Sequence, residues 1–129
     1  MKSFTDLDQS RKLAGILSNE SADMRYGYIA PYDYSDRMYD GGYDEIPYPK
    51  DFLIKNPNFS ADEYEAELPC WSLTALLSVI PKPDLVQNSE GTWLLHSWVN
   101  DYPWSVGGYS NPVDACVEMI IKLRELNLL

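Results

Sequence analysis

Residues 92–126 read TWLLHSWVNDYPWSVGGYSNPVDACVEMIIKLREL, and this stretch predicts two strands followed by a helix. Thr92 to Val99 and Trp104 to Tyr109 are short runs rich in aromatic and β-branched residues, which is typical of strands. The pair Asn100-Asp101 between them is a turn signal. We therefore expect an antiparallel pair of strands that leads directly into the last element of the chain.

The helix at the end of this stretch has a strong N-terminal signal. Asn111 can cap the open amides of the first turn, Pro112 suits the first helical position, and Asp114 favours the positive end of the helix dipole. Five apolar residues at helical spacing predict its buried face: Val113, Cys116, Val117, Ile120 and Leu123.

Three further elements are expected upstream. A first helix should begin at Thr5, as its N-cap, and end at Ser18. Residues 22–30 alternate between apolar and polar character and predict a strand. A second helix should begin with Pro69 in its first turn and end before Pro81.

Two segments are expected to be loops, a long one over residues 31–67 and a shorter one over 81–91. Four prolines interrupt the long segment, and Gly41-Gly42 marks a turn. Between Asn19 and Glu67 there are 12 acidic and 4 basic residues, so −8 of the formal net charge of −10 falls there. A loop of this length inside a compact domain is usually functional or partly disordered.

The predicted order is helix, strand, long loop, helix, strand, strand, helix. It indicates an α+β fold in which a small antiparallel sheet of about three strands has helices packed on one face. A chain of 129 residues is the usual size of one domain, so we expect residues 1–129 to form a single domain with one core.

The acidic charge excludes some partners. With 20 acidic and 10 basic residues, the chain lacks the excess of Lys and Arg that binds nucleic acid directly or attaches to an anionic membrane. A basic protein partner and a cation remain open. The start, MKSFTDLDQSRK, has no apolar segment typical of a secretory leader, and Cys70 and Cys116 form no CxxC pair. We expect a cytoplasmic protein with reduced thiols.

The residues with catalytic potential are few. His96 is the only histidine, and with Cys70 or Cys116 it would offer a Cys–His pair. Cys70 is expected in the first turn of a helix, where the pKa of a thiol tends to fall. No nucleophile signature surrounds it, and buried cysteines commonly serve packing. We therefore predict no catalytic residue and no cofactor, and an enzyme remains the alternative.

Five carboxylates in this region suggest a calcium site: Asp33, Asp36, Asp40, Asp44 and Glu45. Their spacing does not match that of an EF-hand calcium loop. An EF-hand loop that starts at Asp36 has Met38 at its third position and Pro47 at its twelfth. We predict no metal site here, while a looser divalent site stays open.

Tyrosine is concentrated in the same region, since seven of the ten tyrosines lie between residues 26 and 48. Tyrosine combines a large apolar area with a polar tip and is enriched at binding surfaces. Tyr26 and Tyr28, on the expected strand, should cover the core. The predicted partner-binding residues are Tyr32, Tyr34, Asp36, Tyr39, Asp40, Tyr43 and Asp44.

Three pieces of the chain carry a resemblance: Ser21-Ala22-Asp23-Met24; Leu68-Pro69-Cys70-Trp71-Ser72-Leu73 with Leu76-Leu77; and Asn111-Pro112-Val113-Asp114-Ala115 with Glu118-Met119. In this order they resemble an uncharacterised family of small proteins carried on prophages and other mobile elements of gut Bacteroides-type bacteria. The resemblance implies an accessory gene product of a mobile element. It carries over no catalytic residue, because that family has no assigned activity.

The preferred hypothesis is a non-enzymatic protein that binds a protein partner through its acidic, tyrosine-rich surface. The rings would contribute affinity, and the carboxylates would steer the surface toward a basic patch. One alternative is a small enzyme with a Cys/His or carboxylate site. Another is a DNA mimic, whose clustered carboxylates imitate phosphates and inhibit a DNA-binding protein.

Overall fold

The structure is a computed structural model of residues 1–129, and it describes all of them except residues 1, 30–31, 35–36, 40 and 51–65. The described residues form three α-helices, a short 3₁₀ helix and nine strands. The helices are α1 (Leu7–Ala14), α3 (Leu73–Val79), α4 (Pro112–Glu125) and the 3₁₀ helix Asn19–Ser21. The strands are β1 (Met24–Ile29), β2 (Tyr32–Tyr34), β3 (Arg37–Tyr39), β4 (Gly42–Tyr43), β5 (Tyr48–Pro49), β6 (Ala66–Cys70), β7 (Pro83–Gln87), β8 (Trp93–Val99) and β9 (Tyr102–Tyr109).

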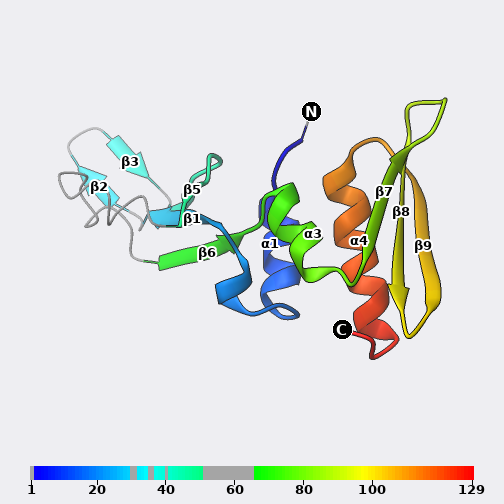
Figure 1. Cartoon of the computed structure of the whole chain (residues 1–129). Coiled ribbons are helices and arrows are strands. Elements are labelled where there is room, and N and C mark those ends of the chain that lie inside the picture. The colour runs from blue at the N-terminus through cyan, green and yellow to red at the C-terminus, as the bar shows by residue number, and fades with distance from the viewer. Residues whose placement is uncertain (1, 30–31, 35–36, 40, 51–65) are drawn as a thin grey trace.

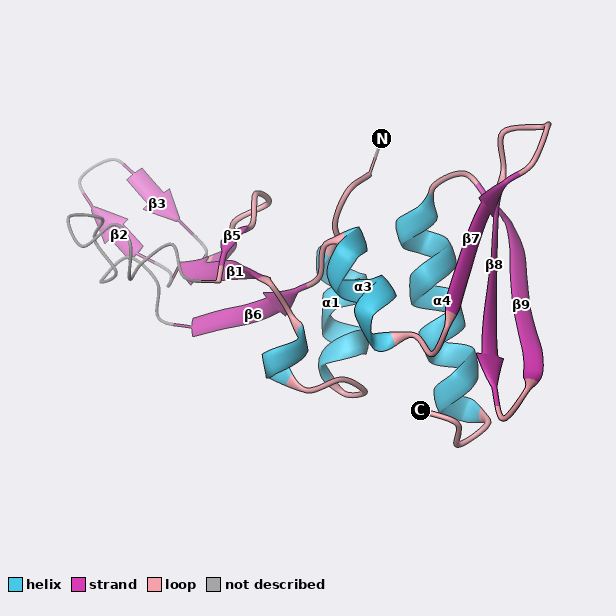
Figure 2. Cartoon of the chain, viewed as in Figure 1, coloured by secondary structure: helices cyan, strands magenta, loops and turns pink. Residues whose placement is uncertain are grey.

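The helices lie between two small antiparallel sheets (Figures 1 and 2). On one side, β7, β8 and β9 form a three-stranded sheet in that order, and α4 packs against β8 and β9. On the other side, β1 pairs with β4, β5 and β6, and α1 packs against β6. The strands β2 and β3 form a separate hairpin. The protein therefore has an α+β fold, with a second sheet that the sequence analysis did not predict.

The β8–β9 hairpin confirms the prediction from residues 92–109. Asn100 and Asp101 both have positive φ angles, 51° and 61°, which the tight hairpin turn requires and which Asn and Asp tolerate well. The loop predicted over residues 81–91 is wrong in part, because Pro83–Gln87 pairs with β8 as an edge strand. Only Leu85 of β7 is even half-buried, so β7 lacks the alternation of apolar residues that marks a strand.

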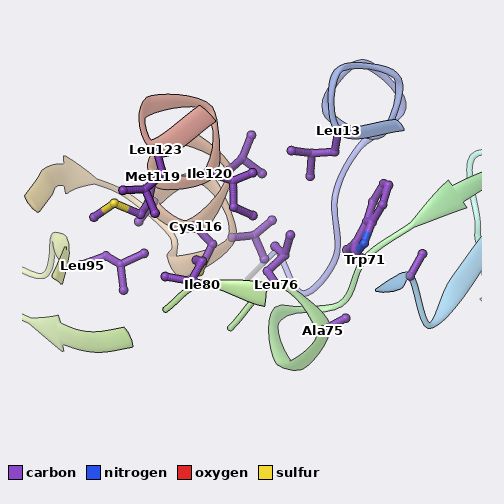
Figure 3. Packing of buried hydrophobic residues seen from close by; sticks show 14 residues of the cluster. Leu13, Trp71, Ala75, Leu76, Ile80, Leu95, Cys116, Met119, Ile120 and Leu123 are labelled. Carbon is purple, nitrogen blue, oxygen red and sulfur yellow. The ribbon is translucent and has the colours of Figure 1, made fainter. Parts of the chain in front are cut away.

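Helix α4 confirms the predicted cap and the predicted buried face. The Asn111 side chain accepts a hydrogen bond from the Asp114 amide at 2.9 Å, and Pro112 stands at the first position. The five residues of the predicted face are all buried. Together with Leu13 of α1, Leu76 of α3 and Leu95 of β8 they make the core between the helices and the three-stranded sheet (Figure 3).

Helix α1 begins one residue later than predicted. Its N-cap is Asp6, whose carboxylate accepts from the Gln9 amide at 2.8 Å, while the Gln9 side chain accepts from the Asp6 amide at 3.1 Å. Thr5 is fully buried and its amide donates to the Trp71 carbonyl at 2.9 Å. Because Thr5 is engaged in this tertiary contact, the next residue with a capping side chain, Asp6, is the N-cap. The helix also ends earlier, at Ala14 instead of Ser18.

The predicted start of the second helix at Pro69 is wrong. Pro69 lies within β6, opposite Arg25 of β1, and α3 begins at Leu73 with Ser72 as its N-cap. Pairing of β6 with β1 overrides the local signal, since a strand's stability depends on its neighbours more than on its own residues. For the same reason Cys70 is the last residue of a strand and does not lie in the first turn of a helix.

The predicted strand at 22–30 is confirmed as β1, but the long loop predicted at 31–67 is wrong over its described part. Strands β2 to β5 and the start of β6 lie within it. On one side β1 pairs with β6, and on the other with β4 and then β5. Residues 44–47 bulge out between β4 and β5 opposite only two residues of β1. Strands of two to five residues with long-range partners leave little periodicity to detect.

Among the described residues, no helix combines the length and apolar character needed to cross a bilayer.

Candidate functional site

The structure places part of the predicted binding set on the hairpin β2–β3. Tyr32 and Tyr34 belong to β2 and Tyr39 to β3, and the backbone register puts Tyr32 opposite Tyr39. Asp36 and Asp40 lie outside the described residues. The hairpin therefore places two of the predicted tyrosines opposite each other on adjacent strands.

Tyr43 and Asp44, the other predicted residues, lie in the sheet around β1. Tyr43 is half-buried, with its ring edge-on to that of Tyr28 at 5.2 Å between centroids. The Arg11 guanidinium of α1 lies 5.8 Å from the centre of the Tyr43 ring. The Asp44 amide donates to the Gly27 carbonyl at 2.9 Å. Tyr43 thus joins the sheet to α1 and has only part of its surface open to a partner.

The bulge over residues 44–47 presents the most exposed large apolar side chain of the described chain. Ile46 is 81% exposed, whereas the neighbouring Pro47 is buried. Glu45 is also exposed and forms no ion pair with any described residue. Two consecutive residues of the bulge therefore expose a carboxylate and an apolar side chain to solvent.

A cavity of about 570 Å³ opens beside this bulge. It lies between the N-terminal segment, the first half of α1, β1 and the bulge. Its lining residues are Lys2, Phe4, Asp6, Leu7, Asp8, Arg11, Tyr26 and Glu45. A volume of this size is within the range of ligand-binding pockets.

The floor of the cavity rests on a buried polar cluster that fixes the N-terminal segment. Tyr26 is 2% exposed and its hydroxyl donates to the Thr5 carbonyl at 2.7 Å. The Thr5 hydroxyl is hydrogen-bonded to the Ser10 hydroxyl at 2.8 Å and accepts from the Trp71 amide at 3.1 Å. Burial is the main cause that raises the pKa of Tyr26 above its ordinary value.

The rim of the cavity carries a charge network. The Lys2 ammonium group lies 2.8 Å from Asp6 and 2.9 Å from Asp114, which ties the N-terminal segment to the first turn of α4. Partial burial lowers the pKa of Lys2, but hydrogen bonds to both carboxylates outweigh this effect and raise it. Burial likewise raises the pKa of Asp6 and Asp114, and the hydrogen bonds that they accept, from Lys2 first, outweigh it and lower both.

Lys2→Met should lower the free energy of unfolding by about 1 kcal/mol at pH 7. The contribution of Asp6 and Asp114 is complete above their ordinary pKa of 3.8 and is lost as the pH falls through their lowered folded values. The contribution of Lys2 to stability is complete below its ordinary pKa of 10.5 and is lost as the pH rises through its raised folded pKa. Urea unfolding measures the free energy of unfolding of both proteins at pH 7 and at about pH 2. The loss of unfolding free energy caused by Lys2→Met should be smaller at pH 2.

Lys50→Met is the matched control for this prediction. Lys50 forms one long ion pair with Glu20, at 3.7 Å, and the two side chains are 42% and 90% exposed. Its replacement should change stability by less than about 0.5 kcal/mol. A Lys2→Met effect of the same size at both pH values would show that packing of the Lys2 stem, and not its charge, is responsible.

Cys70 and His96 do not meet. Cys70 ends β6, on the α1 side of the helices, whereas His96 is on β8, in the sheet on the other side (Figure 1). Burial raises the pKa of Cys70, the opposite of what the sequence analysis expected, and raises the pKa of Cys116 to about 12. Both thiols are free and buried, so neither forms a Cys–His nucleophile with His96.

His96 instead lies in a row of three polar residues across the outer face of the β7–β9 sheet. Asp84 of β7 and Ser105 of β9 are its register partners, and its Nδ1 lies 2.6 Å from the Ser105 hydroxyl. No hydrogen bond or ion pair joins Asp84 to His96, and none of the three lines the cavity beside Ile46. The row therefore lacks the second hydrogen bond that would orient the imidazole as a base.

Sequence reasoning missed Ile46, Phe4, Leu7 and Arg11 as members of the candidate site. Ile46 had a local signal, since it is an aliphatic residue between Glu45 and Pro47 in a segment with the composition of a loop. The others had none, because only the pairing of β1 with β4 and β5 brings the bulge next to α1.

Comparison with known proteins found no matching family model, curated protein or solved structure.

Proposed function

We propose that the chain is a non-enzymatic protein that binds a protein partner through the bulge at residues 44–47 and the surface around it. As the resemblance implies, it would be an accessory protein of a mobile element. The observation that carries the proposal is the exposure of Ile46, at 81%, in the same bulge as Glu45, which lines a cavity of about 570 Å³. A single exposed apolar residue is common on protein surfaces, but one next to a concave site with apolar walls is typical of a contact residue.

The surroundings of Ile46 support the same proposal. Tyr43 and Glu45 precede it by three residues and by one, so an aromatic ring, a carboxylate and an aliphatic side chain fall within four consecutive residues. The formal charge of −8 over residues 19–67 would steer a partner with a basic patch toward this side of the protein. The buried, high-pKa thiols and the incomplete His96 row give an enzyme no comparable support.

Replacing Ile46 by serine should weaken partner binding about five- to thirtyfold, which corresponds to loss of about 1–2 kcal/mol of apolar burial. The tagged full-length chain is incubated with a lysate of its source cells at low and at high salt, and retained proteins are identified and quantified by mass spectrometry. We expect a stoichiometric partner that leaves at high salt and that Ile46→Ser retains poorly.

Val86→Ser is the matched control, because Val86 is an exposed β-branched residue on the other sheet, at 43% exposure. It should retain the partner as wild type does. If Val86→Ser loses the partner and Ile46→Ser keeps it, the binding surface is the outer face of β7–β9 and the proposal is wrong. Capture of a DNA-binding protein through Ile46 would favour the DNA-mimic form of the hypothesis.

A further inference from the structure

We propose that the cavity beside Ile46 receives a lysine or arginine side chain of the protein partner. The inference rests on the proposed function and adds to it the chemistry of the contact next to Ile46. It follows from three properties of the cavity: its apolar walls, the pairing of the cations that line it, and the one carboxylate left over.

The walls suit an aliphatic stem. Phe4 of the N-terminal segment and Leu7 of α1 are half-buried, and the buried Tyr26 of β1 lines the cavity with them. The Tyr26 hydroxyl already donates to the Thr5 carbonyl, so the ring offers its apolar surface and no free donor. Lys and Arg lay their methylene stems on such apolar surface while the charged head stays at a polar rim.

Both cations of the cavity already have carboxylate partners. Lys2 is held by Asp6 and by Asp114, at 2.8 and 2.9 Å. Arg11 is paired with Asp8 at 3.3 Å and also lies over the Tyr43 ring. An anionic ligand would therefore have to compete with existing ion pairs.

The remaining charge is negative. The lining holds two bases, Lys2 and Arg11, and three acids, Asp6, Asp8 and Glu45, which leaves a formal charge of −1. Glu45 is the acid without an ion-pair partner among the described residues, and it lies at the rim beside Ile46. A lysine or arginine side chain could lay its methylene stem on Phe4 and Leu7 while its charged head forms an ion pair with Glu45. The ligand would then neutralise the formal charge of −1 and cover the apolar wall.

The probe is the peptide acetyl-Gly-Arg-Gly-amide, and its matched control is the same peptide with citrulline, which has the shape of arginine without the charge. Binding to the full-length chain is followed by amide chemical shifts in ¹⁵N NMR spectra. We expect the arginine peptide to shift the amides of residues that line the cavity at low salt. The citrulline peptide should bind at least about fivefold more weakly, and about 0.5 M salt should weaken the arginine peptide toward the same level.

Two charge-reversed variants test the role of Glu45. Glu45→Lys should weaken the arginine peptide about tenfold. Glu90→Lys makes the same change in net charge at an exposed position between β7 and β8 and should leave binding within about twofold of wild type. Equal binding of the two peptides, or equal effects of the two variants, would overturn the inference.

The two proposals fail in distinguishable ways. If Ile46→Ser loses the partner while the arginine peptide shows no specific binding, the protein-binding surface stands and the cationic pocket is rejected. If the arginine peptide binds through Glu45 while Ile46→Ser retains the partner in full, the pocket takes cationic ligands but the proposed partner surface is wrong, and the inference about the partner's contact residue is rejected with it.

Discussion

The Trp71→Ala protein is expected to lose about 3–5 kcal/mol of unfolding free energy. Trp71 is fully buried, immediately after β6, and its indole donates to the Ser21 hydroxyl at 3.0 Å. It forms part of the core cluster that includes Leu13 of α1 and Leu76 of α3 (Figure 3). Its removal leaves a large cavity where the β1–β6 sheet meets the helices, and a loss of this size is a substantial fraction of a small protein's total stability.

Urea unfolding followed by circular dichroism at 222 nm measures this effect without dependence on tryptophan fluorescence. The control is Trp98→Ala, since Trp98 is 44% exposed on the outer face of β8 and should cost about 1 kcal/mol or less. Similar losses for the two variants would mean that Trp71 does not hold the sheet to the helices as the structure shows.

Thr5→Val should cost about 2–4 kcal/mol, although it preserves the shape of the side chain. The Thr5 hydroxyl is a partner of the Ser10 hydroxyl and accepts from the Trp71 amide, and all of these groups are buried. Valine leaves the Trp71 N–H and the Ser10 hydroxyl each short of a hydrogen bond, and a buried polar group without a partner costs about 1–3 kcal/mol.

The comparison variant is Thr5→Ser, which keeps the hydroxyl and removes one buried methyl group. Its expected cost is about 1 kcal/mol, from the loss of apolar burial and the small cavity left behind. The order of stability should therefore be wild type, then Thr5→Ser, then Thr5→Val, in the same unfolding assay. A Thr5→Val protein at least as stable as Thr5→Ser would show that the methyl group, and not the hydrogen bonds, is what this site requires.

Local signals were reliable where the residues that specify an element lie within it. Asn111 and Pro112 predicted the start of α4 correctly, because a cap and a first-turn proline act on the amides immediately next to them. The hairpin β8–β9 was predictable for the same reason, since its turn depends on two residues that adopt positive φ. These elements come from one continuous stretch of the chain.

Local sequence signals gave wrong predictions where an element depends on contacts with residues distant in the chain. Pro69 and Thr5 both carry good helix-start chemistry, yet Pro69 pairs with Arg25 in the sheet and Thr5 is buried against Trp71. The candidate site described above shares only Tyr43 and Asp44 with the seven predicted contact residues. Tyr43 and Asp44 were predicted as contact residues, whereas Ile46 was not, and the cavity beside it involves α1 residues about 35 positions away.

Four properties could be predicted from the amino-acid sequence alone: the α+β class, the final helix with its buried face, the hairpin before it, and the acidic charge concentrated in residues 19–67. These properties follow from short-range chemistry: caps, turn residues, apolar periodicity and a simple sum of charges. The second sheet, the burial of Thr5 and the position of Glu45 in one cavity with Phe4 and Leu7 became visible only in the folded protein. Their physical cause is the pairing of β1 with strands distant in the chain, which no local pattern encodes.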